Sequence, residues 1–242
     1  MMRNKIVLLG VSLMVLSCLP IPSIDDENSS GSGNNVSAVY PIACYLFDGS
    51  AEDVSGNDFD GILNGNPEFI SDTPDGSAGA LKLNAFKEQF VNIPYPLLNG
   101  QDSYSFSIWI KDFSQGIVFS SEGGDDIPYL YVRDNQRFML YNNYYGYYDN
   151  YTFAYDCTSI MSSAWHHIAV SSYDGVTSLY IDGRKVDSLD QNYSTSTCTK
   201  VYIGGNADGR YDNYMTMKID NVMFFDYCLT DAEVKFIYQN RL

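Results

Sequence analysis

Residues 165–187 constrain the fold of this chain more than any other stretch. Two apolar-rich runs, 165–172 and 177–181, flank a first Asp-Gly pair at 174–175, and a second pair at 182–183 leads into a third run. Glycine adopts positive φ without steric cost, so Asp-Gly between such runs is typical of a two-residue hairpin turn. We therefore predict three antiparallel strands joined by two short hairpins, around which a two-sheet β-sandwich is built.

Residues 1–17 have the pattern of a secretory signal peptide. Arg3 and Lys5 precede an apolar run that is too short to span a bilayer and is followed by a polar tract. The sequence Val-Leu-Ser-Cys ending at Cys18 resembles a bacterial lipobox, in which cleavage before the cysteine is followed by lipidation of its thiol. The alternative is an ordinary signal peptide that contains a cysteine. We predict that Cys18 is lipidated, since two or more acyl chains provide stable anchoring.

Residues 18–38 are rich in Ser, Gly, Asn, Asp and Pro and should form a flexible tether with a reach of about 25 Å. Residues 39–242 form one domain, because about 200 residues suit a single β-sandwich. We therefore expect the chain to touch the membrane only through its lipid anchor. The expected location is the bacterial outer membrane, with the domain in the periplasm or exposed at the surface.

The chain is strongly acidic, with a formal net charge of −16. Removal of residues 1–17 takes away Arg3 and Lys5 and moves this charge to −18. Such a surface argues against nucleic acid or bare anionic lipid as a partner. It is compatible with neutral glycans and bound divalent cations.

Several sequence motifs resemble those of one family in the same order. The run WHHIAV at 165–170, followed by LYIDG at 179–183, resembles the signature of the laminin-G-like, concanavalin A-like jelly-roll family. Other landmarks of that family are matched by YLFDG at 45–49, YSFSIWIK at 104–111, VYIGG at 201–205 and KIDNVMFF at 218–225. The resemblance covers residues 39–242. It implies an all-β, two-sheet antiparallel jelly roll with a short C-terminal helix.

Two local patterns refine this expectation. Ile219 and Val222 both have core character but differ in parity along one strand, which predicts a β-bulge near residues 220–221. Thr230, followed three residues later by Glu233, predicts a capping box at the start of a helix over about 231–240.

Four cysteines of the exported domain suggest two disulfides, for which three connectivities exist. Cys44 lies on the predicted first strand and Cys228 at the end of the last, and the family pairs those two strands. Cys157 and Cys198 each border a strand near residues 165–187. We predict Cys44–Cys228 and Cys157–Cys198; the alternative is four free thiols.

The sequence offers little for catalysis. Hydrolases on this sandwich carry a strand with two carboxylates about 5.5 Å apart, and no such strand occurs in the sequence. His166 and His167 are adjacent on one strand, so they point to opposite faces and cannot converge on a metal. We predict that one is hydrogen-bonded inside the sandwich, that the other lies near the surface, and that the protein is not an enzyme.

A calcium site is predicted where the first and last strands meet. Carboxylate and amide groups crowd residues 48–60, and Asp220 begins the last strand, which should run beside Asp48. Oxygen ligands of this kind suit Ca²⁺. The alternative is a loop in which these carboxylates accept backbone N–H bonds. The predicted ligands of this structural Ca²⁺ are Asp48, Asn57 and Asp220.

Recognition is predicted in two Tyr-rich loops. Residues 142–151 contain five Tyr, three Asn, one Asp and one Gly, and residues 206–214 are similar. Tyrosine presents a flat apolar face with a polar tip, which suits sugar stacking or protein contact. The alternative is that these tyrosines alternate inward along ordinary strands. The predicted ligand-binding residues are Tyr144, Tyr145, Tyr147, Tyr148, Asp208, Arg210 and Tyr211.

Family resemblance makes a glycan the first expected partner, because such modules most often bind glycans. We therefore predict a non-catalytic carbohydrate-binding module on a surface-tethered lipoprotein. The alternative is an adhesion or scaffold protein whose Tyr-rich loops bind a cell-surface protein.

Overall fold

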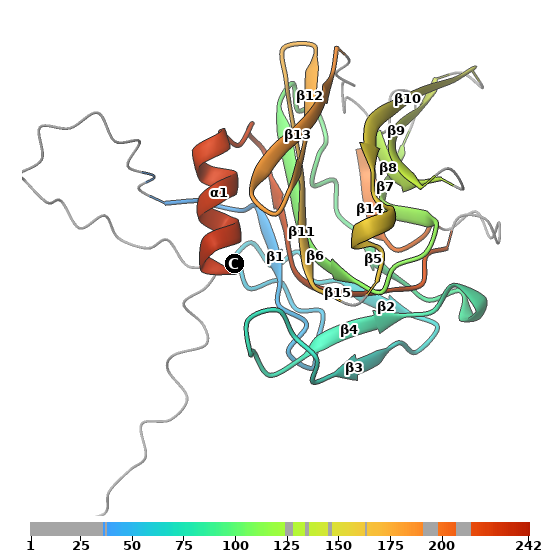
Figure 1. The fold of residues 1–242 in the computed structure, drawn as a ribbon. Coiled ribbons are helices and arrows are strands. Elements are labelled where there is room, and N and C mark those ends of the chain that lie inside the picture. Colours follow the sequence, from blue (N-terminus) through green and yellow to red (C-terminus); the bar gives the residue numbers. More distant parts are fainter. Residues whose placement is uncertain are drawn as a thin grey trace, which may run out of the picture.

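The computed structural model describes residues 36, 38–123, 128–133, 136–144, 147–162, 164–190, 198–206 and 214–242. Figure 1 shows two facing β-sheets, with helix α1 (Asp231–Asn240) against the outer side of one of them. The predicted antiparallel sandwich with a short C-terminal helix is therefore confirmed. The predicted signal peptide, Cys18 and nearly all of the tether lie outside the described residues.

The first sheet carries the 165–187 meander at one edge. From that edge its order is β13 (Arg184–Leu189), β12 (Val176–Ile181), β11 (His166–Tyr173), β6 (Tyr104–Lys111), β15 (Met217–Phe225), β4 (Ala80–Leu83) and β3 (Glu68–Ile70), with β1 (Ala43–Tyr45) also pairing with β15. Within the described chain, no helix has the length and apolar character needed to cross a membrane.

The second sheet faces the first across the main core. Its order is β10 (Tyr147–Asp156), β9 (Arg137–Tyr144), β8 (Pro128–Val132), β7 (Gly116–Gly123), β14 (Cys198–Ile203), β5 (Phe90–Ile93) and β2 (Ile62–Asn64). Two short 3₁₀ helices, η1 (Ala85–Lys87) and η2 (Thr158–Ile160), lie in the connections.

Both predicted hairpins of the meander are confirmed. Asp174 and Gly175 have φ of 47° and 78°, and Asp182 and Gly183 have φ of 49° and 72°. Positive φ at both central residues defines the type I′ turn, whose twist matches that of the flanking strands. The second turn joins Ile181 of β12 to its partner Arg184 on β13, so Asp182 lies at one end of the first sheet.

Strand β6 shows how the first sheet is covered on both faces, as its sequence predicts. Phe106, Ile108 and Ile110 are fully buried in the core between the sheets. Trp109 points to the opposite face and is also buried, because α1 and the chain end cover that face. The outer cluster contains Val234 and Ile237 of the helix.

The predicted bulge and helix cap are both present. Strand β15 shifts register against β6 between Asp220 and Met223, and Asn221 takes a φ of 46°. Thr230 and Glu233 form the reciprocal capping box of α1. The bulge turns consecutive residues of β15 so that both faces of the strand meet apolar neighbours.

The predicted loop at residues 142–151 is corrected by the structure. Residues 142–144 and 147–151 form the paired ends of β9 and β10, in which Tyr147 lies opposite Tyr144 and Tyr148 opposite Asn143. Tyrosine has a high strand propensity, which agrees with the alternative that these residues lie along ordinary strands.

The predicted disulfide Cys157–Cys198 is wrong, since neither cysteine is in a disulfide. The two cysteines adjoin β10 and β14, which are separated by three strands of the second sheet. Strands about 4.8 Å apart put such positions about 19 Å from one another, whereas a disulfide needs a Cα separation of about 4.4–6.8 Å. Each thiol instead lies near a backbone carbonyl, Cys157 near that of Gln136 and Cys198 near that of Lys200.

The predicted disulfide Cys44–Cys228 is also wrong, because the thiol of Cys228 is free. Cys44 does lie on β1 beside β15, but its register partner is Met223. Cys228 lies five residues further along the chain and approaches Ser171 Oγ at 3.1 Å. The predicted pairing of the first and last strands is correct, but Cys228 lies beyond the end of β15 and not opposite Cys44.

Candidate functional site

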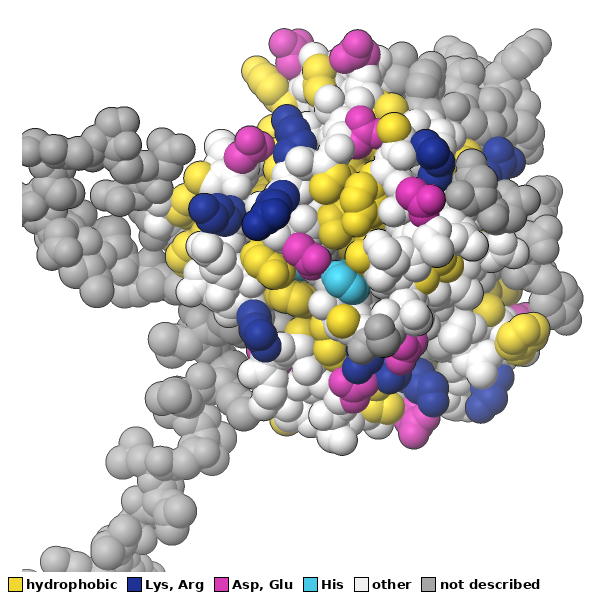
Figure 2. Space-filling view, in the orientation of Figure 1, with side chains coloured by type: hydrophobic (Ala, Val, Ile, Leu, Met, Phe, Trp, Pro, Cys, Tyr) yellow, Lys and Arg dark blue, Asp and Glu magenta, His cyan; other side chains and the backbone are white. Residues whose placement is uncertain are grey.

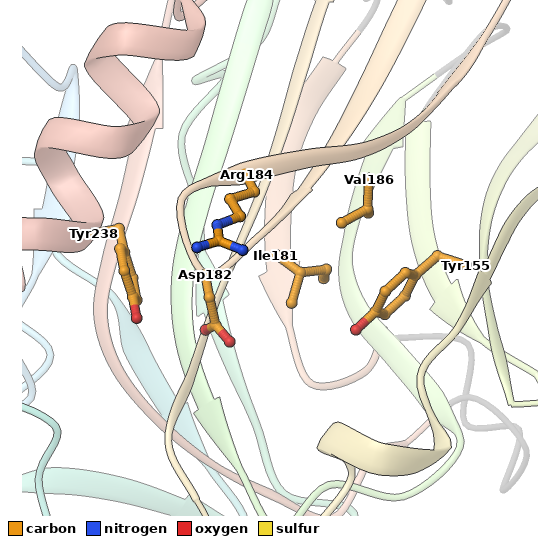
Figure 3. Close-up of a pocket in the computed structure, with 6 residues that line it drawn as sticks. All are labelled: Tyr155, Ile181, Asp182, Arg184, Val186 and Tyr238. Carbon is orange, nitrogen blue, oxygen red and sulfur yellow. The ribbon is translucent and has the colours of Figure 1, made fainter.

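The described surface is hollowed where the second turn of the meander meets the C-terminal end of α1. One hollow of about 370 Å³ is lined by Tyr155, Ile181, Asp182, Arg184, Val186 and Tyr238 (Figure 3). The adjoining hollow of about 560 Å³ is lined by Pro74, Trp109, Trp165, His166, Asp182, Tyr238, Gln239 and Arg241. Because Asp182 and Tyr238 belong to both, we treat the two hollows as one groove.

Figure 2 looks onto the face of the molecule that carries this groove. Hydrophobic side chains occupy the middle of the face, and acidic and basic side chains are interspersed among them. In Figure 3, Asp182 and Arg184 lie between Tyr238 of α1 on one side and Tyr155 of β10 on the other. The groove therefore draws residues from both sheets and from the helix.

Gly183 allows the turn and the helix to meet closely. Its φ of 72° lies in the left-handed region, and a Cβ at this position would lie 2.8 Å from Cδ1 of Tyr238. The absence of a side chain thus lets the Tyr238 ring pack against the turn backbone. The same ring stacks on Trp109 with 5.7 Å between centroids and 21° between planes.

Asp182 is held in the groove by two residues of β11. Its Oδ1 accepts a hydrogen bond from the backbone N–H of His167 at 3.0 Å, and its Oδ2 lies 2.9 Å from Nδ1 of His166. The Asp182 side chain remains about one-third exposed. A fixed, accessible carboxylate of this kind is an acceptor for ligand hydroxyl groups.

Trp165 is oriented by Asp72. Its indole N–H donates to Asp72 Oδ1 at 3.1 Å, while Lys218 Nζ and Lys111 Nζ lie 2.8 Å and 2.9 Å from Asp72 Oδ2. The hydrogen bond from Lys218, with smaller contributions from Lys111 and Trp165, lowers the pKa of Asp72 to about 2 against the opposing effect of burial. Asp72 is therefore ionised at neutral pH and accepts the indole hydrogen bond as a carboxylate.

The opposite wall is formed by Tyr155 at the end of β10. Burial, and after it the charge of Asp182, raises the pKa of Tyr155. The phenol is therefore neutral at physiological pH and donates as well as accepts hydrogen bonds. Trp165, Tyr155 and Tyr238 thus each contribute an aromatic side chain to the lining of the groove.

The groove does not contain the groups that glycoside hydrolysis needs. Asp182 is the one carboxylate among the described residues that line it, whereas retaining and inverting hydrolysis both use a pair. Aromatic faces with a few fixed polar groups are instead typical of a ligand-binding site.

A serine–histidine contact lies nearby but is sealed from solvent. Ser107 Oγ is 2.8 Å from His167 Nε2, and both residues have no exposed surface. Burial lowers the pKa of His167 to about 4, and its Nδ1 has no hydrogen-bond partner. Among the described residues no carboxylate lies on Nδ1, and both side chains are buried away from solvent.

The two histidines do point to opposite faces, as predicted. His166 lies near the surface at the groove, while His167 is buried and hydrogen-bonded. His167, however, lies under α1 beside Trp109 and Tyr238 rather than between the sheets.

The structure leaves most of the predicted binding residues undescribed. Tyr145, Asp208, Arg210 and Tyr211 lie outside the described residues, and Tyr144, Tyr147 and Tyr148 are placed by their backbone pairing alone.

Trp165 and His166 line the groove, although neither is among the predicted ligand-binding residues. The hairpin pattern of the meander is the sequence feature that could have indicated their position. In a meander, the start of β11 and the turn after β12 lie side by side, since Ile168 pairs with Ile181.

Asp48 and Asp220 come together, but Asn57 does not join them. Asp48 Oδ1 accepts from the Gly79 N–H at 2.6 Å, and Ser77 Oγ lies 3.4 Å from Asp220 Oδ2. The Asn57 amide donates to the Ile42 carbonyl at 3.0 Å, near Phe224 and four residues along β15 from Asp220. That separation corresponds to about 10 Å or more along the strand.

Asp220 is fully buried, so its charge would need a compensating group such as a cation. Burial, then the charge of Asp75 and after it that of Asp48, raises the pKa of Asp220 to about 8. A divalent cation would compensate these like charges, and Ca²⁺ accepts carboxylate, carbonyl and water oxygen atoms together. Among the described residues, no group of three or more His, Cys, Asp or Glu side chains is arranged to hold a metal ion, so carbonyl or water ligands would have to complete the site.

The fold and the groove define a two-sheet jelly-roll domain with an aromatic-lined, solvent-exposed groove. The chain belongs to the concanavalin A-like lectin/glucanases superfamily, whose family model matches residues 86–235. A comparison with curated proteins gives no match.

Two groups of solved structures share the fold. Domain 4 of AbnA, an extracellular arabinanase from Geobacillus stearothermophilus in complex with arabinotriose, is similar with a TM-score of 0.68 and 20% identity, over 82% of this chain and 98% of that one. The binding domain of botulinum neurotoxin DC in complex with SialylT has a TM-score of 0.62 and 15% identity, over 84% of this chain and 51% of that one. The same toxin domain in complex with rat synaptotagmin II has a TM-score of 0.64 and 15% identity, over 84% of this chain and 52% of that one. This chain thus spans about half of the toxin domain.

Proposed function

We propose that this protein is a non-catalytic carbohydrate-binding module. The observation that carries the proposal is the placement of Trp165, Tyr155 and Tyr238 around the carboxylate of Asp182 in one groove. A sugar ring has an apolar C–H face that packs on an aromatic ring and hydroxyl groups that a carboxylate accepts. The sugar-bound arabinanase domain and the SialylT-bound toxin domain support the proposal through their shared fold.

The groove is suited to recognition because its parts are ordered before a ligand arrives. Trp165 is held by Asp72, Asp182 by β11, and Tyr238 by its stack on Trp109. Ligand binding then costs less side-chain entropy than it would at a mobile surface. The single carboxylate supports binding without hydrolysis.

The proposal includes the setting of the domain in the cell. A lipid on Cys18 would hold the domain at the bacterial outer membrane through the tether over residues 18–38, and this rests on the lipobox-like sequence. A structural Ca²⁺ bound by Asp48 and Asp220 would join the beginning and the end of the domain. The burial of Asp220 beside like charges supports that site.

The test is a glycan array followed by titration calorimetry with any retained oligosaccharide. We expect Trp165→Ala to weaken binding about tenfold or more, because it removes an aromatic platform. Tyr173→Ala is the matched control, since Tyr173 is an exposed aromatic residue at the other end of β11, outside the groove. A triple change of Tyr144, Tyr147 and Tyr211 to Ala tests the two Tyr-rich segments separately.

Failure of every glycan to bind, together with a co-purifying protein partner, would contradict the proposal and favour the adhesion alternative. Loss of glycan binding in the triple Tyr variant, with Trp165→Ala unaffected, would move the site from the groove to the Tyr-rich segments. Equal loss in Trp165→Ala and Tyr173→Ala would indicate general damage to the fold, which a melting curve detects.

A further inference from the structure

We infer that the ligand of the groove is an acidic oligosaccharide, one of whose carboxylates pairs with Arg184. This inference rests on the proposed function and specifies the class of glycan. It starts from the shape of the site: two adjoining hollows of about 370 Å³ and 560 Å³ share Asp182 and Tyr238. A groove divided in this way suits a chain of two or more sugar units rather than a single one.

Arg184 is the group that gives one end of the groove its charge preference. It begins β13, and in Figure 3 its guanidinium lies between Tyr238 and Val186. Its guanidinium makes no hydrogen bond or ion pair with any residue that the structure describes, whereas its backbone pairs with Ile181 of β12. Lys111 and Lys218, by contrast, are already paired with Asp72 at 2.9 Å and 2.8 Å. Among the described residues, nothing therefore competes with an anion for the Arg184 guanidinium.

Asp182 lines the same hollow but does not form an ion pair with Arg184. Its two oxygen atoms are engaged by the His167 N–H and by His166, on the side of β11. A guanidinium with five N–H donors remains available, and its planar fork matches a carboxylate in two parallel hydrogen bonds. The apolar side chains of Ile181 and Val186 beside it reduce the competition from water.

The other end of the groove presents different chemistry. Trp165 lines it, and its polar N–H is already used by Asp72, so the ring itself is what remains for a ligand. Arg241 also lines this end, but its guanidinium donates to the carbonyl of Pro74. A sugar bound there is therefore recognised chiefly by stacking. The expected ligand therefore has a carboxylate on one unit and an apolar ring face on a neighbouring unit.

The charge of the whole protein sharpens this specificity. With a formal net charge of −16, the chain repels polyanions at long range. A densely sulfated polysaccharide is repelled by this net charge more strongly than a ligand with few charges is. A uronic-acid oligosaccharide with few charges keeps the pairing with Arg184 and suffers less repulsion.

The test uses oligosaccharides in matched pairs: oligogalacturonide, oligomannuronate and a glucuronate-containing oligosaccharide, each with its methyl ester. The ester keeps the sugar ring and removes the negative charge. We expect at least one acid to bind about tenfold more tightly than its ester by titration calorimetry, as a charge-assisted pair implies. Arg184→Gln should abolish that difference.

Lys185→Gln is the matched control for Arg184→Gln. It removes the same charge from the neighbouring residue of β13, whose ammonium lies over the Tyr180 ring at 5.8 Å and outside the groove. This control should keep the preference for the acid, and a melting curve should show both variants folded.

Two results would overturn the inference. If neutral glycans bind in a Trp165-dependent manner while every acid binds no better than its ester, the inference is wrong and the proposed function stands. If no glycan of either kind binds the folded protein, both the inference and the proposed function are wrong.

Discussion

The indole N–H of Trp165 donates a hydrogen bond to Asp72 Oδ1 at 3.1 Å, across 93 residues of sequence. Asp72 follows β3 at one edge of the first sheet, and Trp165 immediately precedes β11. The same carboxylate binds Lys111 and Lys218, so the ring is attached to a network rather than to one mobile side chain. An aromatic platform with one orientation binds a sugar face at a lower entropic cost than a free ring does.

Asp72→Ala should weaken glycan binding about three- to tenfold, because Trp165 loses the group that orients it. Asp72→Asn should have a smaller effect, since the amide oxygen still accepts the indole hydrogen bond. Acrylamide quenching of tryptophan fluorescence provides an independent measurement. Trp165 should become more accessible in the Ala variant, while the buried Trp109 should not change.

Stability should respond much less than binding to these two changes. Asp72 is about two-fifths exposed, and ion pairs of that exposure contribute about 1 kcal/mol or less. Unchanged quenching and unchanged affinity in Asp72→Ala would show that packing alone orients Trp165.

His167 should make the domain less stable in mildly acidic solution. Its pKa is lowered to about 4 by burial, whereas the unfolded chain takes up the proton near 6.5. The unfolded state therefore binds more protons between these values, so stability is complete above about pH 6.5 and falls as the pH decreases to about 4. The expected loss is about 3 kcal/mol.

Urea unfolding at several pH values between 4 and 7.5 measures this dependence. In His167→Gln the slope of unfolding free energy against pH should decrease, whatever the variant loses in absolute stability. His166→Gln is the control, because His166 lies at the surface and its loss should leave the His167 contribution in place. Parallel pH profiles for the wild type and His167→Gln would disprove this assignment.

The parts of the fold that depend on neighbouring residues could be predicted from sequence. The Asp-Gly turns, the Thr230 capping box and the bulge beside Asp220 each follow from a few adjacent residues, and all are present. In β6, alternation along the strand likewise places Phe106 and Ile108 on one buried face and Trp109 on the other.

The groove could not be predicted in the same way, because its contacts join distant segments. Tyr155, Asp182 and Tyr238 come from β10, a turn and a helix, and nothing in their local sequence states that they meet. The predicted disulfides are wrong for a related reason, since they too depend on contacts between distant segments. Cysteine count and compartment favour pairing, but bonding depends on the position of each cysteine along and across the strands, which parity alone does not determine.

Gly183→Ala should destabilise the domain more than Gly175→Ala does. Both glycines have positive φ, 72° and 78°, so alanine is strained at each turn. A Cβ at residue 175 meets nothing within 4 Å, whereas one at residue 183 would lie 2.8 Å from Tyr238. We expect Gly183→Ala to cost about 2 kcal/mol more in unfolding free energy.

Glycan binding distinguishes the two glycine variants further. Gly183→Ala pushes on Tyr238 and should weaken binding at the groove, while Gly175→Ala should leave affinity unchanged. Equal destabilisation in chemical denaturation would mean that Tyr238 moves aside without cost.

The three free cysteines should differ in reactivity toward a thiol reagent such as DTNB. Cys157 and Cys198 are buried, and burial raises the pKa of each thiol to about 11. Both should react only after unfolding. Cys228 is half-buried and should react first in the native protein, and Cys228→Ser should remove that early phase. A Cys157–Cys198 cross-linked peptide in non-reducing mass spectrometry would contradict this expectation.

Calcium should stabilise the domain through Asp220 if the proposed site forms. Ca²⁺ at about one hundred times its dissociation constant adds about 2.7 kcal/mol, which corresponds to a rise of about 5–10 °C in melting temperature for a domain of this size. The melting temperature should fall by that amount with a chelator and recover when Ca²⁺ is added. Asp220→Asn should abolish the response, since the amide supplies one neutral oxygen in place of a carboxylate.

Two control variants separate this site from its alternatives. Asp182→Asn changes the groove carboxylate and should keep the full calcium response. Asn57→Ala should also keep it, because the Asn57 amide donates to Ile42 rather than facing Asp220. A wild-type melting curve that is indifferent to both chelator and Ca²⁺ would rule the site out. Asp48 and Asp220 would then act only as acceptors of hydrogen bonds such as those from Gly79 and Asn221, which is the second reading that their sequence context allowed.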